Sequence, residues 1–284
     1  MAIVFASSLD ELDPRAEDFL AERVERNVAA SLLAQARAGR LAPQRALFAW
    51  EVGQGARLRL FAMRTPPWPM LVSELERGRE HEDARALIER WLAEDPELPG
   101  VTGVPAAARA VAGAWEALTG GRTRCRMRDA LHVLDEVIEP PVWPAGELRR
   151  ARRRDRELLI EWERAFVAEA GVVEAAAREA PRTIDRRLAA GAQFLWHDGR
   201  PVSALALSPE IAGTVRIGPV YTPRERRGRG YASAAVARAS LDALARGARR
   251  CMLFTDVSNP TSNKIYAAVG FRRVADWEEL EFTR

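Results

Sequence analysis

The sequence predicts a mixed α/β fold built twice, as two domains in tandem, and three observations lead to this prediction. The chain of 284 residues is about two ordinary domains long. A segment rich in proline and glycine, residues 137–146, divides it into halves of similar length. In each half, apolar runs typical of strands alternate with apolar residues at helical spacing. The expected domains are residues 1–139 and 147–284, with a linker at 140–146.

The C-terminal half is expected to form a mixed sheet with helices on both faces. Asp198-Gly199 stands between two apolar runs, which is a strong signal for a β-hairpin. Asp155 is a candidate N-cap, and Gly270 is suited to end a helix. In chain order, the expected elements are strand 147–151, helices 156–170 and 173–189, strands 192–196, 201–207 and 214–221, helix 231–245, strand 251–255, helix 261–269, and strands 271–274 and 278–282.

The N-terminal half repeats part of this order, which predicts a diverged duplication. Thr65-Pro66 corresponds to Thr222-Pro223, and Gly120 ends a helix as Gly270 does. The expected elements are helix 16–38, strands 46–52 and 58–63, helices 82–93 and 106–118, and strands 123–127 and 131–137.

The composition is that of a folded globular protein, with 48% hydrophobic and 29% charged residues. The formal net charge is only +3, although the isoelectric point is about 9.3. No run reaches the ~20 apolar residues of a membrane helix, and the first residues lack the basic region of a signal peptide. Cys125 and Cys251 lie far apart, which argues against a zinc or disulfide framework. We therefore expect a cytoplasmic protein without metal or membrane partner.

The strongest candidate for chemistry is the segment VYTPRERRGRGYASAAVA, residues 220–237. A strand is expected to end in a turn rich in arginine and glycine, and an alanine-rich helix begins at once. The first N–H groups of a helix have no partner within it, and the helix dipole adds about half a positive charge there. Gly228 and Gly230 remove the Cβ atoms that would keep a phosphate away from those amides. The segment therefore predicts a site for a polyphosphate.

Two motifs of this half resemble those of the GNAT acetyltransferase superfamily. Residues 227–232, RGRGYA, match its acyl-CoA loop, R/Q-x-x-G-x-G/A. Residues 259–271 look like its second signature, N-x-x-[SA]-x-x-x-Y-x-x-x-G-F. One helix and one strand separate the two motifs, and together they are specific. The resemblance covers residues 146–284, and it extends to the N-terminal half by topology alone.

The resemblance implies an N-acetyltransferase with acetyl-CoA as cosubstrate and a small-molecule amine as acceptor. The backbone of Val220 and Thr222 would pair with pantetheine, and the amides of residues 227–232 would surround the pyrophosphate. Tyr266 matches the family's general acid, which protonates the departing thiolate. The implied cofactor-binding residues are Val220, Tyr221, Thr222, Arg227, Gly228, Arg229, Gly230, Tyr231, Ala232, Asn259, Ser262, Asn263 and Tyr266.

Several assignments have an alternative. Asn259 can contact pantetheine or cap the helix that follows it, and Tyr266 can be an ordinary packed tyrosine. Trp162 and Phe166 can line an acceptor pocket or pack in the core. The general base is open between a relaying water and a carboxylate, and the candidate carboxylates are Glu161, Glu163, Glu169 and Glu210.

The N-terminal half is expected to be a degenerate copy without a cofactor site. Thr65-Pro66 is followed by Pro67 and Pro69, which have no N–H for a phosphate. Glu116 stands where the C-terminal copy has Tyr266. An alternative function is a catalytically silent protein that senses CoA. A nucleic-acid partner is not expected, because no aromatic residue is interleaved with the arginines of residues 222–230. The oligomeric state is open between a monomer and a homodimer.

Overall fold

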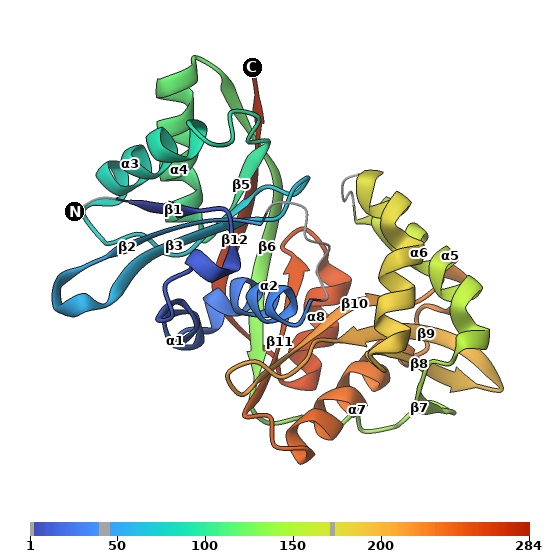
Figure 1. Ribbon diagram of the computed structural model, residues 1–284. Helices are drawn as coiled ribbons and strands as arrows, with labels where there is room; N and C mark the ends of the chain where they lie inside the picture. The colour runs from blue at the N-terminus through green and yellow to red at the C-terminus, as the bar shows by residue number, and fades with distance from the viewer. Residues whose placement is uncertain (1–2, 40–45, 171–173) are drawn as a thin grey trace. The chain divides into compact units, whose positions relative to one another are not determined.

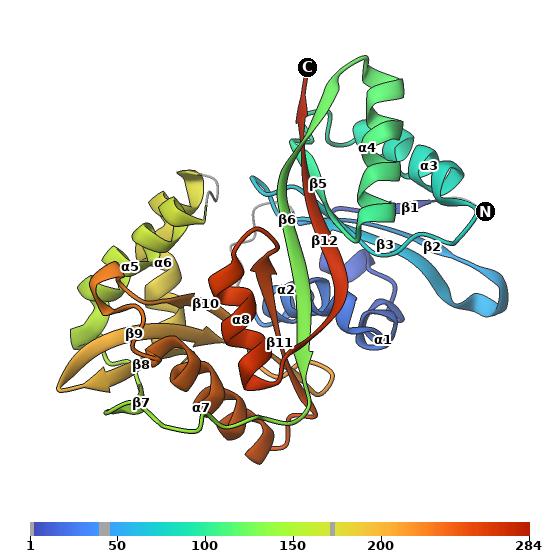
Figure 2. The same ribbon diagram turned by 180° about the vertical axis from the view of Figure 1, so that it is seen from behind.

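The computed structural model describes residues 3–39, 46–170 and 174–284 (Figures 1 and 2). The chain divides into two compact units. The first contains Met1–Leu131, Asp256–Ser258 and Val274–Arg284, and the second contains His132–Thr255 and Asn259–Arg273. The units therefore differ from the expected domains, because the C-terminal residues belong to the first unit and the chain changes unit at Leu131–His132.

The first unit has the strand order β1-β2-β3-β4-β5-β12-β6, in which β4 and β5 are parallel. Helices α3 and α4 lie side by side in both views (Figures 1 and 2). The elements are β1 (Val4–Ala6), α1 (Ala16–Ala21), α2 (Asn27–Arg37), β2 (Leu47–Val52), β3 (Leu58–Arg64), β4 (Met70–Val72), α3 (Glu80–Leu92), β5 (Gly100–Gly103), α4 (Pro105–Thr119) and β6 (Arg122–Leu134). The C-terminal part of β12 (Arg272–Thr283) also belongs to this unit.

The second unit has the strand order β11-β10-β9-β8-β7. The hairpin predicted at Asp198-Gly199 is present, since β8 and β9 are antiparallel and Asp198 pairs with Arg200. The elements are β7 (Glu147–Arg150), α5 (Arg156–Glu169), α6 (Glu174–Ala189), β8 (Gln193–Asp198), β9 (Arg200–Leu207), β10 (Thr214–Tyr221), α7 (Tyr231–Ala245), β11 (Arg250–Asp256) and α8 (Pro260–Val269). Residue 173, the expected start of α6, lies outside the described residues.

The same succession, β-α-α-β-β-β-α-β-α-β, runs from β1 to β6 and again from β7 to β12. The two glycines that align the halves occupy the same place in it, since Gly120 follows α4 with φ +70° and Gly270 follows α8 with φ +107°. Both have the left-handed conformation that ends a helix at little cost only for glycine. The predicted tandem of two mixed α/β modules is confirmed.

Strand β12 explains why the C-terminal residues belong to the first unit. It runs antiparallel to β5, where Gly100 lets it approach, because a Cβ at Gly100 would collide with the carbonyl oxygen of Leu280. Arginines of β6 pair with glutamates of β12, at 2.7 Å for Arg124–Glu281, 3.1 Å for Arg126–Glu279 and 3.4 Å for Arg128–Glu278. Each of these two strands was expected as two shorter ones, so that expectation was wrong.

Two local predictions also need correction. The helix expected over residues 16–38 is two helices, α1 and α2, separated by a short 3-10 turn at Val24–Arg26. Asp155 does not cap α5 with its side chain. Its carboxylate instead accepts from the N–H of Arg152 at 2.7 Å and pairs with Arg149 at 2.8 Å, because these donors precede the helix.

Separate cores lie on the two faces of the second unit's sheet, as predicted. One side receives α7 and α8, with Ile217, Val236 and Phe271 among its buried residues. The other receives α5 and α6, with Leu159 and Ile184. The first unit has its own core around two tryptophans, Trp91 and Trp115. None of the described helices has the length and apolar character needed to cross a membrane.

Candidate active site

Strand β10 changes partners along its length, and this opens one side of its backbone. It runs parallel to β11 over Thr214–Arg216, and beyond that point its pairing within the described residues is with β9. The register with β9 is irregular between Ile217 and Val220, which indicates a β-bulge. The sequence-predicted residues Val220 and Tyr221 therefore lie where β10 no longer pairs with β11.

The N-terminus of α7 follows β10 directly and carries unused hydrogen-bond donors. After a 3-10 turn at Arg224–Arg226, the chain reaches Gly230, the N-cap residue, with φ +79°. No side chain caps the helix, and its first turn contains no acidic residue. The first bond within the helix is donated by Ala234 N–H, so in the described chain the N–H groups of residues 231–233 are not used by the helix.

The two glycines of the loop face open space. A Cβ at Gly228 would find no atom within 4 Å, and one at Gly230 would meet only Pro144 Cγ, at 4.0 Å. Packing therefore does not require glycine here. Glycine is instead required by the positive φ angles at both positions and by the open approach to the helix amides. Both features suit a loop that surrounds a phosphate.

The arginines of the loop are partly held by Glu169 at the end of α5. Arg227 Nη2 lies 2.6 Å from the Glu169 carboxylate, and Arg224 Nε lies 3.3 Å from it. These guanidinium groups lower the pKa of Glu169, with the Arg227 hydrogen bond as the largest cause. Arg227 Nε also donates to the carbonyl of Thr222 at 2.8 Å. Arg227 thus braces the loop in this structure, while Arg229 is exposed.

The side chain of Tyr231 bonds to the β8–β9 turn. Its ring is buried, and its hydroxyl donates to Asp198 Oδ2 at 2.7 Å. This bond ties the first residue of α7 to the β8–β9 turn. The backbone N–H groups of Tyr231 and Ala232 lie in the first turn of α7, which the helix leaves unbonded.

The asparagines of the second motif bond mainly to their own helix. Asn259 Oδ1 accepts from Ser262 N–H at 3.0 Å, which makes Asn259 the N-cap of α8. Asn263 Nδ2 donates to the Asn259 carbonyl at 2.9 Å. The capping role predicted as one alternative for Asn259 is confirmed, and it uses the amide of Ser262.

Tyr266 is a buried phenol in the core on the α7 side of the sheet. Its ring is 9% exposed and meets Phe271 edge-on, with centroids 6.1 Å apart. Burial raises the pKa of Tyr266 to about 12, so the hydroxyl keeps its proton at neutral pH. The described residues supply no hydrogen-bond partner for it. The same core contains Tyr231 and Ile217, with Val220 packed against it, so the second motif lies beside the loop and β10.

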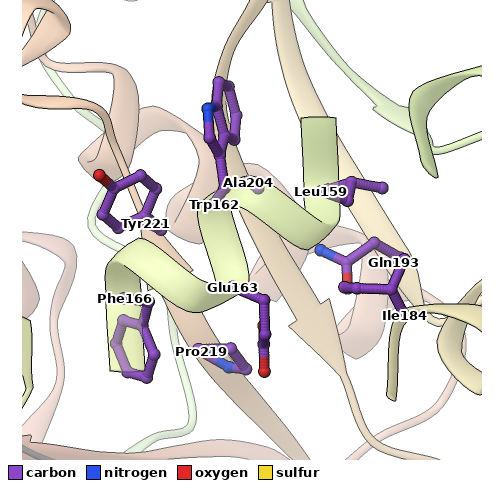
Figure 3. A pocket seen from close by; sticks show the side chains of 9 residues that line it. All are labelled: Leu159, Trp162, Glu163, Phe166, Ile184, Gln193, Ala204, Pro219 and Tyr221. Carbon is purple, nitrogen blue, oxygen red and sulfur yellow. The ribbon is translucent and has the colours of Figure 1, made fainter. Parts of the chain in front are cut away.

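A narrow hollow of only about 10 Å³ lies on the opposite face of the sheet, between α5, α6 and β10 (Figure 3). Trp162 and Tyr221 approach across it, with ring centroids 6.0 Å apart. Trp162 belongs to the core, which confirms the packing alternative, and it also lines the hollow; its place in an acceptor pocket stays a prediction. The lining residues are Leu159, Trp162, Glu163, Phe166, Ile184, Gln193, Ala204, Pro219 and Tyr221.

The four candidate carboxylates for the general base lie in different surroundings. Glu163 lines the hollow, and Glu169 is held by Arg227. Glu161 and Glu210 are exposed. Sequence reasoning missed Gln193, a buried amide in the hollow, although a polar residue at the start of an apolar strand was a usable signal.

Comparisons with known proteins agree with this geometry. Residues 146–271 match the family model of the acetyltransferase (GNAT) family. A search of curated proteins found no match. Three solved structures with similar folds are a GNAT-family acetyltransferase from Colwellia psychrerythraea (13% identity, 99% of both chains, TM-score 0.61), a GCN5-related N-acetyltransferase from Sphaerobacter thermophilus (18%, 99% of this chain and 95% of that chain, 0.59), and a tandem GNAT protein from the clavulanic acid biosynthesis pathway (16%, 99% and 98%, 0.55).

At these identities the structural likeness establishes the fold of the whole chain, a tandem of two GNAT-like modules. The family match lies in the half that carries the loop before α7 and Tyr266. Residues 146–271 are thus similar to the acetyltransferase (GNAT) family, and they include both the loop before α7 and Tyr266.

Proposed function

We propose that the C-terminal half transfers an acyl group, acetyl in the first instance, from acyl-CoA to the amine of a small molecule. The uncapped N-terminus of α7 carries the proposal. Its free N–H groups, the open approach at Gly228 and Gly230, and the absence of an acid in its first turn fit a pyrophosphate. When bound, acyl-CoA supplies an activated thioester, so no covalent enzyme nucleophile is needed.

The other residues of the proposed cofactor site are assigned here in sequence order. The backbone of Val220 and the N–H of Thr222 would hold pantetheine, since Arg227 already occupies the Thr222 carbonyl. Arg229 would meet the phosphates from the exposed side of the loop. Asn259 and Ser262 contribute by holding the start of α8 in place, and Asn263 braces that cap.

Tyr266 would supply the proton that the departing sulfur requires. As the new C–N bond forms, the C–S bond breaks, the amine loses a proton and the sulfur gains one. A phenol whose pKa is about 12 remains protonated up to strongly basic pH. It is a weaker acid than a thiol in water, whose pKa is ~8.5. It therefore acts first as a hydrogen-bond donor and transfers its proton as negative charge accumulates on sulfur.

The test is a thermal-shift titration with acetyl-CoA, followed by free-thiol release with a panel of amines. Ligand binding should raise the melting temperature according to RT ln(1 + [L]/Kd), whereas NAD and ATP should have no comparable effect. Binding without thiol release for any amine would favour the silent CoA sensor. No binding at all would overturn the site.

A further inference from the structure

The first residue of α7 is tied to the turn of the β8–β9 hairpin. The Tyr231 hydroxyl donates to Asp198 Oδ2 at 2.7 Å, across 33 residues of sequence. Asp198 ends β8, and Gly199 makes the turn with φ +63°. A hydrogen bond between a hydroxyl and a carboxylate is charge-assisted and belongs to the stronger kind. The hairpin turn therefore fixes the position of the Tyr231 side chain.

Packing holds the same side chain. Tyr231 is only 7% exposed and belongs to the core on the α7 side of the sheet, together with Trp196 and Val202 of the hairpin. Water competes poorly for a hydrogen bond at the edge of such a core. The hydrogen bond to Asp198, followed by burial, raises the pKa of Tyr231, while Arg229 of the loop acts against them. The phenol therefore keeps its proton and remains the donor.

The end of β8 also holds the segment that borders Gly230. Trp196 Nε1 donates to the Ala145 carbonyl at 3.0 Å, and the Trp196 ring stacks on that of Trp143, with centroids 6.2 Å apart. Pro144 lies between these two contacts, and its Cγ would be 4.0 Å from a Cβ at Gly230. The end of β8 therefore reaches the start of α7 twice, once directly and once through this segment.

The start of α7 needs this support because no side chain caps it. A capping side chain stabilises a helix by accepting from the N–H of its second or third residue. In α7 such a cap would occupy the N–H of Ala232 or Ser233, which a phosphate would need. The bond from Tyr231 to Asp198 uses a side-chain donor instead. It anchors the first turn and leaves the backbone amides of that turn to a ligand.

Order before binding matters for an anion site made of backbone amides. A site whose groups are already in place loses less conformational entropy when the ligand arrives. Gly228 and Gly230 have wide conformational freedom, so order at the start of α7 has to come from contacts outside these two residues. A first turn that frays would lower the apparent affinity in proportion to the fraction of ordered molecules.

We propose that Tyr231 and Asp198 are positioning residues of the acyl-CoA site. Their bond takes the place of a helix cap and keeps the first turn of α7 ready for the pyrophosphate. Their role lies in cofactor affinity and not in the chemical step. The identity of the ligand rests on the proposed function, but the order of the first turn can be measured without any ligand.

The test compares Tyr231→Phe with wild type in the full chain. The variant keeps the ring in the core and removes only the hydroxyl. Without ligand, the amide of Ala234, which bonds to the Gly230 carbonyl at 2.9 Å, should exchange its hydrogen about tenfold faster. Acetyl-CoA affinity, measured by calorimetry, should fall about three- to tenfold. Unchanged affinity or unchanged exchange in a folded Tyr231→Phe protein would overturn the positioning role.

Variants of Asp198 separate positioning from charge. Asp198→Ala removes the acceptor and also a negative charge near the start of α7. Charge alone predicts tighter binding of acetyl-CoA by this variant, whereas positioning predicts weaker binding. Asp198→Asn keeps an acceptor oxygen and should restore most of the affinity. Tighter binding by Asp198→Ala, or an equal loss in Asp198→Asn, would contradict the proposal.

A double variant and a matched control complete the test. Tyr231→Phe combined with Asp198→Ala should bind acetyl-CoA no more weakly than Tyr231→Phe alone, because both changes remove the same bond; additive losses would show that the two residues act separately and would overturn the proposal. The control is Asp242→Ala, which removes a carboxylate paired with Arg238 near the other end of α7. This control should keep wild-type affinity.

The outcomes separate the positioning role from the proposed function. If wild type fails to bind acetyl-CoA, the proposed function fails, and the exchange of the Ala234 amide in Tyr231→Phe still decides whether the bond orders the start of α7. If Tyr231→Phe binds and cleaves acetyl-CoA with normal affinity, the proposed function stands and the positioning role is wrong.

Discussion

Helices α3 and α7 occupy the same place in the two modules, but their N-termini are used in opposite ways. At α7 the preceding glycine is open, and neither a capping side chain nor an acid is present. At α3 the first turn contains Glu80, Glu82 and Asp83. The carboxylate of Glu80 accepts from Gly78 N–H at 2.7 Å. Neither helix has a capping side chain, but the acids of α3 offset the positive end of its dipole and would repel a phosphate, whereas the first turn of α7 has none.

The modules differ in the same way at a second position. This position lies four residues before the glycine that follows α4 in the first module and α8 in the second. In the second module this residue is Tyr266, whose hydroxyl has no partner in the described chain. In the first it is Glu116, whose carboxylate accepts from both the N–H and the hydroxyl of Thr123, each at 2.7 Å. The comparison teaches that a fold can persist while internal bonds replace the groups that would serve a ligand. It supports the proposal that the N-terminal module has no cofactor site.

The largest expected effect is on turnover in Tyr266→Phe. The ring and its packing remain, but the proton donor is lost, so kcat should fall by about 10²–10⁴ while acetyl-CoA affinity stays within a few fold. The matched variant Glu116→Gln should leave kcat unchanged. Measurement of kcat, Kd and melting temperature on each preparation decides, and a normal kcat in Tyr266→Phe would remove the hydroxyl from the mechanism.

Next in size is the effect of closing the loop before α7. Gly230→Val places a β-branched side chain at φ +79° and in the path to the helix amides. We expect acetyl-CoA affinity to fall by about 100-fold, as for the loss of two charge-assisted hydrogen bonds. Gly78→Val, at φ +85° and equally open, matches its backbone strain and should leave affinity unaltered. If both variants lose affinity alike, strain rather than the site is responsible.

A largely buried carboxyl group of the first unit, Asp129, predicts an effect of pH on the free energy of unfolding. Burial, with Asp256 and Glu279 nearby, raises the pKa of Asp129 in the first unit to about 6. Because a folded-state pKa above the unfolded value means that folding takes up a proton, stability should rise as the pH falls from 7 towards 5. Asp129→Asn should add about 1–2 kcal/mol to the free energy of unfolding at pH 7 and abolish that rise.

Urea unfolding at pH 7 and pH 5 measures the effect of Asp129. The control is Asp10→Asn, an exposed aspartate of the same unit, which should keep the wild-type pH dependence. A variant Asp129→Asn with the stability of wild type at both pH values would contradict the prediction.

The smallest expected effect concerns the ion pairs between Glu169 and the arginines of the loop before α7. Glu169→Gln releases Arg227 and Arg224 from their carboxylate. If these arginines then turn to the phosphates, acetyl-CoA should bind a few fold more tightly at low salt, and added salt should remove the gain. Affinity measured at low and high ionic strength tests this. Unchanged affinity at both would show that the arginines act only within the loop.

Much of the second module could be predicted because its signals are local. The Asp198-Gly199 turn, the glycine after α8 and the strand–loop–helix order around Gly230 depend on neighbouring residues alone. The partner of β12 could not be predicted, because pairing between β5 and the end of the chain depends on Gly100 and on distant arginine–glutamate pairs. The alternation of charges in β6 and β12 also obscured two long strands.

The candidate site divides in the same way. The motif residues around Gly230 and Tyr266 were identifiable because each has a fixed spacing from a glycine. The hollow was only partly visible, since Trp162 and Phe166 follow helical spacing but Gln193 joins them only when β8 packs against α5. Asp155 does precede α5 as expected, but its side chain does not cap the helix because it bonds to Arg149 and Arg152, which lie before it.

The position of β12 has a consequence for how the protein is made. This strand lies between β5 and β6, so the sheet of the first unit has a gap until the last residues of the chain are available. Domains normally fold in the order in which they leave the ribosome. Here the N-terminal module must wait until β12 has been synthesised, with the edges of β5 and β6 unpaired. Loss of β12 would therefore leave the module that was synthesised first incomplete and exposed to aggregation.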